Sequence, residues 1–275
     1  MTSMIFKRYE LKYLMDRVQT EAMMEAMEGN MALDEYGHSQ INNIYLDTDN
    51  YLLARRSIEN PPYKEKLRFR SYGRADSDSE VFVELKKKYE SVVYKRRLSM
   101  PLDEAVDWFT TDTDRFPHTQ IGYEVDYLRR RYEGIHPAML LCYEREAYKS
   151  LDGSDLRITL DTNIRAGTES PDLTSPTGTR GIVPSDHTLM EVKTMYGFPR
   201  WLNAALEENG IFKTSFSKYG NAYKQLELGL SFDDLYRQRR GCALGAAFST
   251  MSPSMLTSSH TDRIRAEYET IQQTN

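Results

Sequence analysis

Residues 64–97 read KEKLRFRSYGRADSDSEVFVELKKKYESVVYKRR, and the pattern within this stretch decides the fold. In its first part Lys66, Arg68 and Arg70 alternate with Leu67 and Phe69, so one strand face is cationic and the other is apolar. The stretch holds eleven Lys or Arg against six Asp or Glu, although the whole chain carries a formal net charge of −5. A cationic segment inside an acidic chain needs its own explanation.

The same alternation recurs in five other segments of the chain. An apolar face opposes a polar one around Glu10, in 81–86, around Tyr143 and Arg145, in 156–161, and around Glu191 and Lys193. Taken singly, each polar face is typical of a strand that looks at water. Taken together, six faces rich in long cations favour one concave surface, because such crowding is repulsive and a bound polyanion would relieve it. The sequence therefore predicts a β-barrel with a hydrophilic lumen and apolar outer faces under helices.

Period-two runs, turn residues and helix-ending glycines predict the remaining elements. The expected strands are Met4–Leu14, Ile41–Leu46, Tyr63–Tyr72, Val81–Tyr89, Val92–Met100, Met139–Tyr148, Leu156–Thr162 and Thr188–Thr194. The expected helices are Asp16–Gly29, Pro101 to about Thr110, and Pro199–Glu208, and the Gly-, Pro-, Ser- and Thr-rich segment Ala166–Asp186 is expected to be a flexible loop. We expect one domain over residues 1–230 and a partly flexible tail with a terminal helix over 231–275.

Composition excludes several classes of protein. The net charge argues against a nucleic-acid binder, and no window approaches 18 apolar residues, so no transmembrane segment is expected. Cys142 and Cys242 are too few for a disulfide framework, and the five histidines show no metal-ligand spacing. The N-terminus lacks the apolar core of a signal peptide, so we expect a cytoplasmic protein.

Nine short motifs occur in an order that resembles a known family. They are Tyr9–Tyr13, Ile44–Asp47, Lys66–Tyr72, Glu84–Lys88, Val92–Arg97, Tyr143–Arg145, Arg157–Thr162, Met190–Lys193 and Phe216–Tyr219. Over about residues 4–228 the chain resembles the VTC domain, the polyphosphate-polymerase branch of the CYTH or triphosphate tunnel metalloenzyme superfamily. The resemblance implies an α+β fold in which eight antiparallel strands close into a tunnel with helices packed outside.

The resemblance also implies roles for individual residues. The residues implied to hold phosphates or take part in catalysis are Lys12, Arg68, Arg70, Lys86, Lys95, Arg145, Arg157, Lys193 and Lys218. Glu191 matches the metal-binding glutamate of the family, Glu10 and Glu84 are assigned to cofactor binding, and the expected cofactor is Mn²⁺ or Mg²⁺. The expected partners are ATP and inorganic triphosphate or polyphosphate, and a peripheral association with a membrane partner stays open.

Two positions depart from the family pattern and bear on the activity. Arg8 stands where the hydrolase and cyclase branches carry the first carboxylate of a Glu-x-Glu-x-Lys motif, and Ser215 stands where the eukaryotic polymerase has a basic residue. The loss of one metal ligand favours a polymerase that moves the γ-phosphate of ATP onto polyphosphate. A triphosphate or polyphosphate hydrolase and a noncatalytic polyanion-binding protein remain as alternatives. The acceptor, the metal preference and the oligomeric state are left open by the sequence.

Overall fold

The computed structural model describes residues 9–90, 92–111 and 116–241. Its strands form one antiparallel sheet: β1 (Tyr9–Met15), β2 (Met31–Asp47), β3 (Tyr63–Tyr72), β4 (Glu80–Tyr89), β5 (Val92–Pro101), β6 (His136–Ser150), β7 (Arg157–Gly167), β8 (Arg180–Gly181), β9 (Thr188–Thr194) and β10 (Lys213–Thr214). Residues 4–8 of the expected first strand and residues 242–275 of the expected tail lie outside the described ranges.

The sheet is open rather than closed. Its order is β10-β1-β9-β7-β6-β2-β3-β4-β5 with β8 beside β7, and within the described ranges no pairing joins β5 to the opposite end. The predicted closed barrel of eight strands is therefore wrong, because the sheet has ten strands and two free edges. β8 and β10 contain two residues each, which is too short for an alternation to be visible in the sequence.

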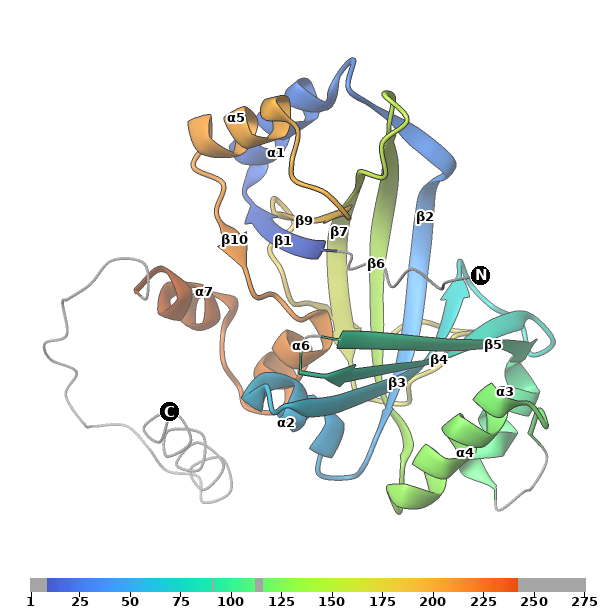
Figure 1. Ribbon diagram of the computed structural model, residues 1–275. Helices are drawn as coiled ribbons and strands as arrows, with labels where there is room; N and C mark the ends of the chain where they lie inside the picture. The colour runs from blue at the N-terminus through green and yellow to red at the C-terminus, as the bar shows by residue number, and fades with distance from the viewer. Residues whose placement is uncertain (1–8, 91, 112–115, 242–275) are drawn as a thin grey trace, which may run out of the picture.

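The sheet is strongly bent. β2, β6 and β7 run side by side as its long middle, with the β3–β5 arm and the β1–β9 arm (β1, β9 and β10) at its two ends (Figure 1). The pairing of β2 with β6 shifts register between Leu33 and His38 and again between Tyr45 and Leu46. Such irregularities bend strands, and the bend leaves the two arms on either side of a concave surface.

Helices cover the outer, apolar face of each arm. α3 (Leu102–Thr110) and α4 (Gln120–Arg131) pack on the β3–β5 arm, where Leu67, Phe69 and Trp108 are fully buried. α1 (Arg17–Met27) and α5 (Arg200–Glu208) cover the β1–β9 arm and β7 through a second core that includes Ile158 and Met23. The predicted outward packing of Leu67, Phe69, Val83, Leu85 and Ile158 is thus confirmed.

A third core fills one end of the concave side. α6 (Lys218–Leu226) lies there against α2 (Leu52–Glu59), and the ring of Tyr219 stacks on Tyr45 of β2 at 4.1 Å between centroids. The buried carboxylate of Asp47 accepts hydrogen bonds from the backbone N–H groups of Leu53 and Ala54 and from the Tyr219 hydroxyl. Asp47 therefore fixes both helices to the end of β2. α7 (Phe232–Gly241) adds Phe232 and Tyr236 to this core, so the chain beyond residue 230 begins by packing on the domain.

Several expected boundaries differ from the structure. β2 begins at Met31 rather than Ile41, α2 and α4 had no counterpart in the expected elements, and the expected loop Ala166–Asp186 contains β8. None of the described helices combines the length and the apolar character needed to cross a membrane.

Candidate functional site

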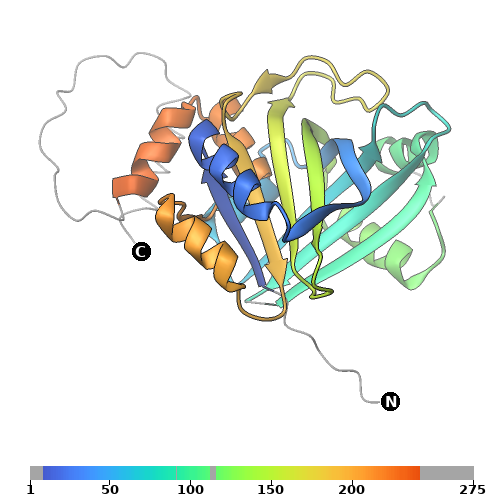
Figure 2. The same ribbon diagram turned by 90° about the horizontal axis from the view of Figure 1, so that it is seen from above.

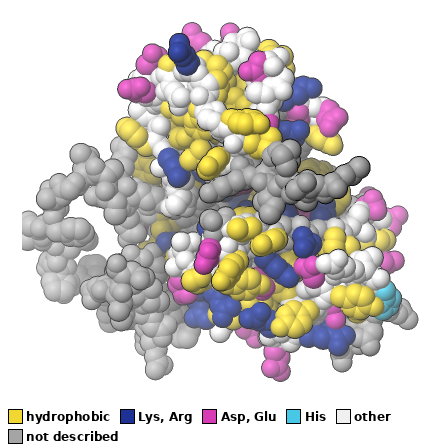
Figure 3. Space-filling model, in the orientation of Figure 1, with side chains coloured by type: hydrophobic (Ala, Val, Ile, Leu, Met, Phe, Trp, Pro, Cys, Tyr) yellow, Lys and Arg dark blue, Asp and Glu magenta, His cyan; other side chains and the backbone are white. Residues whose placement is uncertain are grey.

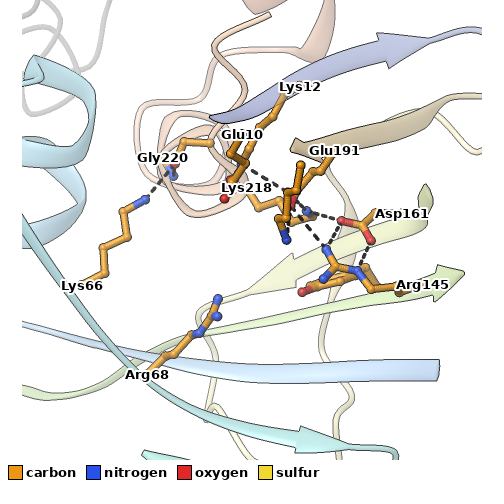
Figure 4. A network of polar contacts seen from close by, with 12 residues as sticks. Glu10, Lys12, Lys66, Arg68, Arg145, Asp161, Glu191, Lys218 and Gly220 are labelled. Carbon is orange, nitrogen blue, oxygen red and sulfur yellow. Dashed lines mark hydrogen bonds and ion pairs between the residues drawn. The ribbon is translucent and has the colours of Figure 1, made fainter. Parts of the chain in front are cut away.

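The concave side of the sheet contains a cavity of about 640 Å³ between the two arms. Its lining includes twelve Lys or Arg but only two Glu: Lys12, Lys64, Lys66, Arg68, Arg70, Lys86, Lys88, Lys95, Arg145, Lys193, Lys213 and Lys218 against Glu10 and Glu191. Figure 4 shows Lys66 and Arg68 on one side of this space and Lys12, Arg145 and Lys218 on the other. Such an excess of positive charge matches a polyanion.

Strand register arranges the cations of the β3–β5 arm in rows. Residues directly opposite one another in neighbouring strands face the same side of a sheet. The rows across β3, β4 and β5 are Arg68–Glu84–Arg97, Lys66–Lys86–Lys95 and Lys64–Lys88–Val93. The cationic face predicted from residues 64–97 is therefore one continuous wall of the cavity.

The middle row consists of three lysines. Among the described residues no carboxylate lies within ion-pair distance of Lys66, Lys86 or Lys95, and Lys66 Nζ instead donates to Ser217 Oγ at 3.0 Å. Burial and the neighbouring Lys12, Lys86 and Lys64 hold the pKa of Lys66 well below its ordinary value. Lys95 keeps one side exposed, yet loss of water within the cavity lowers its pKa to about 8. The protein therefore disfavours the charged form of Lys66 and Lys95, and a bound anion would favour it.

Glu84 holds the arginines of the adjoining row in place. Its carboxylate accepts from Arg68 Nε at 2.8 Å and from Arg97 Nε at 2.8 Å, and Arg70 Nε lies 3.7 Å away. Burial alone would raise the pKa of Glu84, but Arg68, Arg70 and Arg97 lower it to about 2. Glu84 therefore stays ionised and fixes the planar guanidinium groups, which bind phosphate best in a defined orientation.

The opposite wall centres on Glu191 of β9. Its carboxylate lies 3.2 Å from Lys12 Nζ, 3.0 Å from Lys218 Nζ, and 3.7 and 3.8 Å from Arg145 and Lys193. Burial would raise the pKa of Glu191, but Lys218, Lys12 and Arg145 hold it well below its ordinary value. This wall is close to charge balance, in contrast to the lysine row across the cavity.

Asp161 of β7 is a site residue that the sequence analysis did not select. Its carboxylate is completely buried. It accepts hydrogen bonds from Arg145 Nε at 2.6 Å and from Arg145 Nη2 at 2.7 Å, and it also forms an ion pair with Lys218 Nζ. Lys218 and Arg145 also lie over the ring of Tyr143, at 4.7 and 5.3 Å from its centroid. The available signal was the polar face Arg157–Thr159–Asp161, whose carboxylate shares a strand face with Arg157.

Most of the expected site residues meet in this cavity. Lys12, Arg68, Arg70, Lys86, Lys95, Arg145, Lys193, Lys218, Glu10 and Glu191 line it. Glu84 lies just behind the lining. Arg157 is solvent-exposed at the start of β7, opposite Lys193 in the register, and does not line the cavity. The chain also brings in Lys66, Tyr45 and Tyr143, which the assignment of site residues had omitted.

The carboxylates fit a divalent cation only together with a phosphate ligand. Within the described residues no group of three or more His, Cys, Asp or Glu could hold a metal ion. Glu10 and Glu191 nevertheless face the same ammonium group, because Lys12 Nζ lies 3.6 Å from Glu10 Oε1 and 3.2 Å from Glu191 Oε1. Two carboxylates that share one cation are a suitable partial donor set for Mg²⁺ or Mn²⁺, which commonly take further ligands from substrate phosphates.

Comparison with known proteins identifies one family. Residues 7–227 match the VTC domain family, whereas no curated protein matches the chain. A solved Hippeastrum structure, described as a candidate adenylyl cyclase with a dominant triphosphatase activity, is 15% identical and has a TM-score of 0.47 over 80% of this chain and 97% of its own. A candidate adenylate cyclase from Bacillus halodurans is 14% identical, with a TM-score of 0.46 over 76% of this chain and 92% of its own. Likenesses with TM-scores below 0.5 assign no activity to this chain.

Proposed function

This chain belongs to the VTC domain family, and from that membership we propose that it transfers the γ-phosphate of ATP onto a growing inorganic polyphosphate chain. The observation that supports this proposal most strongly is the cavity lining of twelve cations and two glutamates. A surface with this charge excess suits a substrate and a product that are both polyphosphates. Phosphoryl transfer requires mainly positioning and neutralisation of charge from the protein, and the cavity supplies groups for both.

The two walls would divide this work. Arg68 and Arg145 have their guanidinium planes fixed by Glu84 and Asp161, so each can present its remaining N–H groups to phosphate oxygens in a set direction. The lysine row Lys66–Lys86–Lys95 has no carboxylate partner among the described residues, so a bound anion would be the counterion that favours the charged form of these side chains.

We propose Mg²⁺ or Mn²⁺ as the cofactor, held by Glu191 and Glu10. When bound, such an ion would neutralise charge on the phosphate oxygens. Lys12 now lies between these two carboxylates, so it would turn from them toward the phosphates as the ion enters. Lys218 and Arg145 would keep Glu191 ionised throughout.

The experiment is an incubation with ATP and Mn²⁺ in which polyphosphate and free phosphate are both followed. A polymerase accumulates polyphosphate chains, with free phosphate staying a minor product. Free phosphate without polyphosphate would identify a hydrolase, and binding of triphosphate without either product would identify a noncatalytic polyanion-binding protein. Lys86→Met, which removes a cavity charge, should abolish most of the activity, whereas Lys87→Arg should not, because Lys87 points to the outer face and pairs with Glu124 at 3.1 Å.

A further inference from the structure

The turn end of the β4–β5 hairpin carries four apolar side chains that are each about half exposed. Tyr89 is 55% exposed, Val92 and Val93 are each 48% exposed, and Tyr94 is 47% exposed. We call these four residues the hairpin tip. Tyr89 is paired with Val92, and the next two rows pair Lys88 with Val93 and Lys87 with Tyr94, so the tip projects apolar groups from both faces of the hairpin. Core packing does not account for a concentration of exposed apolar groups at one turn.

Basic residues flank the hairpin tip on both strands. Lys87 and Arg96 pair with Glu124 on the outer face, and Lys86, Lys88 and Lys95 line the cavity on the other face. Residues 86–97 contain six Lys or Arg, at 86, 87, 88, 95, 96 and 97, and one acid, Glu90, although the chain as a whole is negatively charged. In the space-filling view, hydrophobic and basic side chains lie intermixed on the lower part of the face, where β4 and β5 run (Figure 3). Figure 2, seen from above, shows the strands of the β3–β5 arm running side by side across the molecule.

We propose that the hairpin tip docks the protein on an anionic lipid surface. Tyr and Val at the tip would enter the headgroup region, where amphipathic aromatic rings are favoured. Lys88 beside the turn, and the net positive charge that Lys87 and Arg96 keep after pairing with Glu124, would face lipid phosphates. Charge complementarity favours this partner, because an apolar tip alone would fit many surfaces, whereas the positive net charge of residues 86–97 fits an anionic one. A second copy of the chain fits less well, since pairing two β5 edges would bring like-charged runs together.

The position of the cavity gives this docking a consequence. Val93 of the tip lines the cavity together with Lys64 and Lys88, which form the row nearest the turn. A molecule docked through its tip would therefore hold this end of the cavity at the lipid surface. The turn of the hairpin is held in place by a backbone hydrogen bond, because Glu90 N donates to Pro62 O at 2.6 Å, just before the start of β3.

The test is co-sedimentation with vesicles of phosphatidylcholine, with and without phosphatidylserine. The wild-type protein should sediment with the phosphatidylserine vesicles only, and added salt should weaken the binding, because exposed charges are screened. The double variant Val92→Thr/Tyr94→Thr keeps strand-forming residues on the outer side of the hairpin and should bind about tenfold more weakly. The matched control is Val18→Thr/Tyr127→Thr, which removes the same two residue types from α1 and α4, where they are 68% and 63% exposed. It should bind as the wild type does.

Four outcomes would overturn the proposal. The first is that the wild-type protein does not sediment with the vesicles, and the second is that the tip variant sediments as well as the wild type. The third is that the control variant loses as much binding as the tip variant. The fourth is a wild-type dimer that the tip variant converts to a monomer, without any binding to vesicles. In a further arm of the experiment, excess inorganic tripolyphosphate is added to fill the cavity. Binding should persist in its presence, and complete loss would mean that lipid phosphate enters the cavity instead. Turnover of ATP is measured in parallel, and the tip variant should retain it, so failure of this proposal is distinguishable from failure of the proposed activity.

Discussion

Asp161 and Arg145 form a two-pronged ion pair between neighbouring strands, with Arg145 Nε 2.6 Å from Oδ1 and Nη2 2.7 Å from Oδ2. The carboxylate has no exposed surface and also receives Lys218 from α6. Two strands and a helix from distant parts of the sequence are therefore joined at one buried charge, directly behind the wall that carries Glu191.

Removing that charge should destabilise the fold. Asp161→Asn leaves Arg145 and Lys218 with Glu191 as their shared counterion, and we expect the free energy of unfolding to fall by about 3 kcal/mol. Denaturant unfolding measures this loss. Asp49→Asn is the control, since the Asp49 side chain is 96% exposed and its charge should matter little. Equal stability of the two variants would show that Glu191 alone is sufficient for both cations.

Arg68→Lys tests whether the cavity recognises phosphate geometry or only charge. The substitution keeps the charge but removes the planar group that Glu84 orients, so triphosphate affinity should fall about tenfold. Calorimetric titration measures the affinity, with Lys87→Arg on the opposite strand face as the silent control. Equal affinity in the wild type and both variants would mean that the cations act only as a diffuse field.

Glu191→Gln separates a metal ligand from a counterion. The variant loses the charge that a divalent ion needs, so metal-dependent turnover should collapse. Triphosphate binding without metal should be unchanged or tighter, because Lys12, Lys218, Arg145 and Lys193 lose a competing carboxylate. Turnover and calorimetric affinity are compared in the same preparation. Retained turnover would assign Glu191 a purely electrostatic role toward these cations.

Triphosphate binding should depend on pH through Lys95. Because its pKa is lowered to about 8, the ammonium group is mostly neutral above that pH and gains its proton as the pH falls through it. Affinity should therefore rise between about pH 9 and pH 7. In Lys95→Arg the charge is permanent, so this part of the pH dependence should disappear, while Lys87→Arg should keep it. The same pH profile in all three proteins would contradict a titrating Lys95.

Local sequence patterns predicted the walls of the site better than the shape of the sheet. β3 and β9 have the expected bounds, and the family resemblance drawn from the nine motifs is confirmed by the match over residues 7–227. Both strands are long enough, and their two faces differ enough in polarity, for the alternation to be visible in the sequence. The first half of β2 is partly or fully exposed along most of its length, so it has no apolar face that would extend the strand toward Met31.

Features that depend on distant partners could not be predicted in this way. The role of Asp161 requires Lys218, which lies 57 residues further along the chain, and that distance in sequence leaves no periodic signal. Glu84 was assigned to cofactor binding from the family resemblance, whereas its three arginine neighbours become visible only when β3, β4 and β5 are in register. Whether the sheet closes likewise depends on bends at β-bulges, which involve pairs of strands and leave no pattern in one segment.

The lysine row has a consequence for the balance between the thermal stability of the fold and the binding of a ligand. Lys66, Lys86 and Lys95 lie side by side in the ligand-free molecule, where burial and neighbouring cations lower the pKa of Lys66 and Lys95, so the site weakens the fold that carries it. Replacing Lys86 with Gln should therefore raise the melting temperature of the free protein while removing most of the rise that triphosphate produces in the wild type. Selection for heat resistance alone would therefore be expected to remove these lysines.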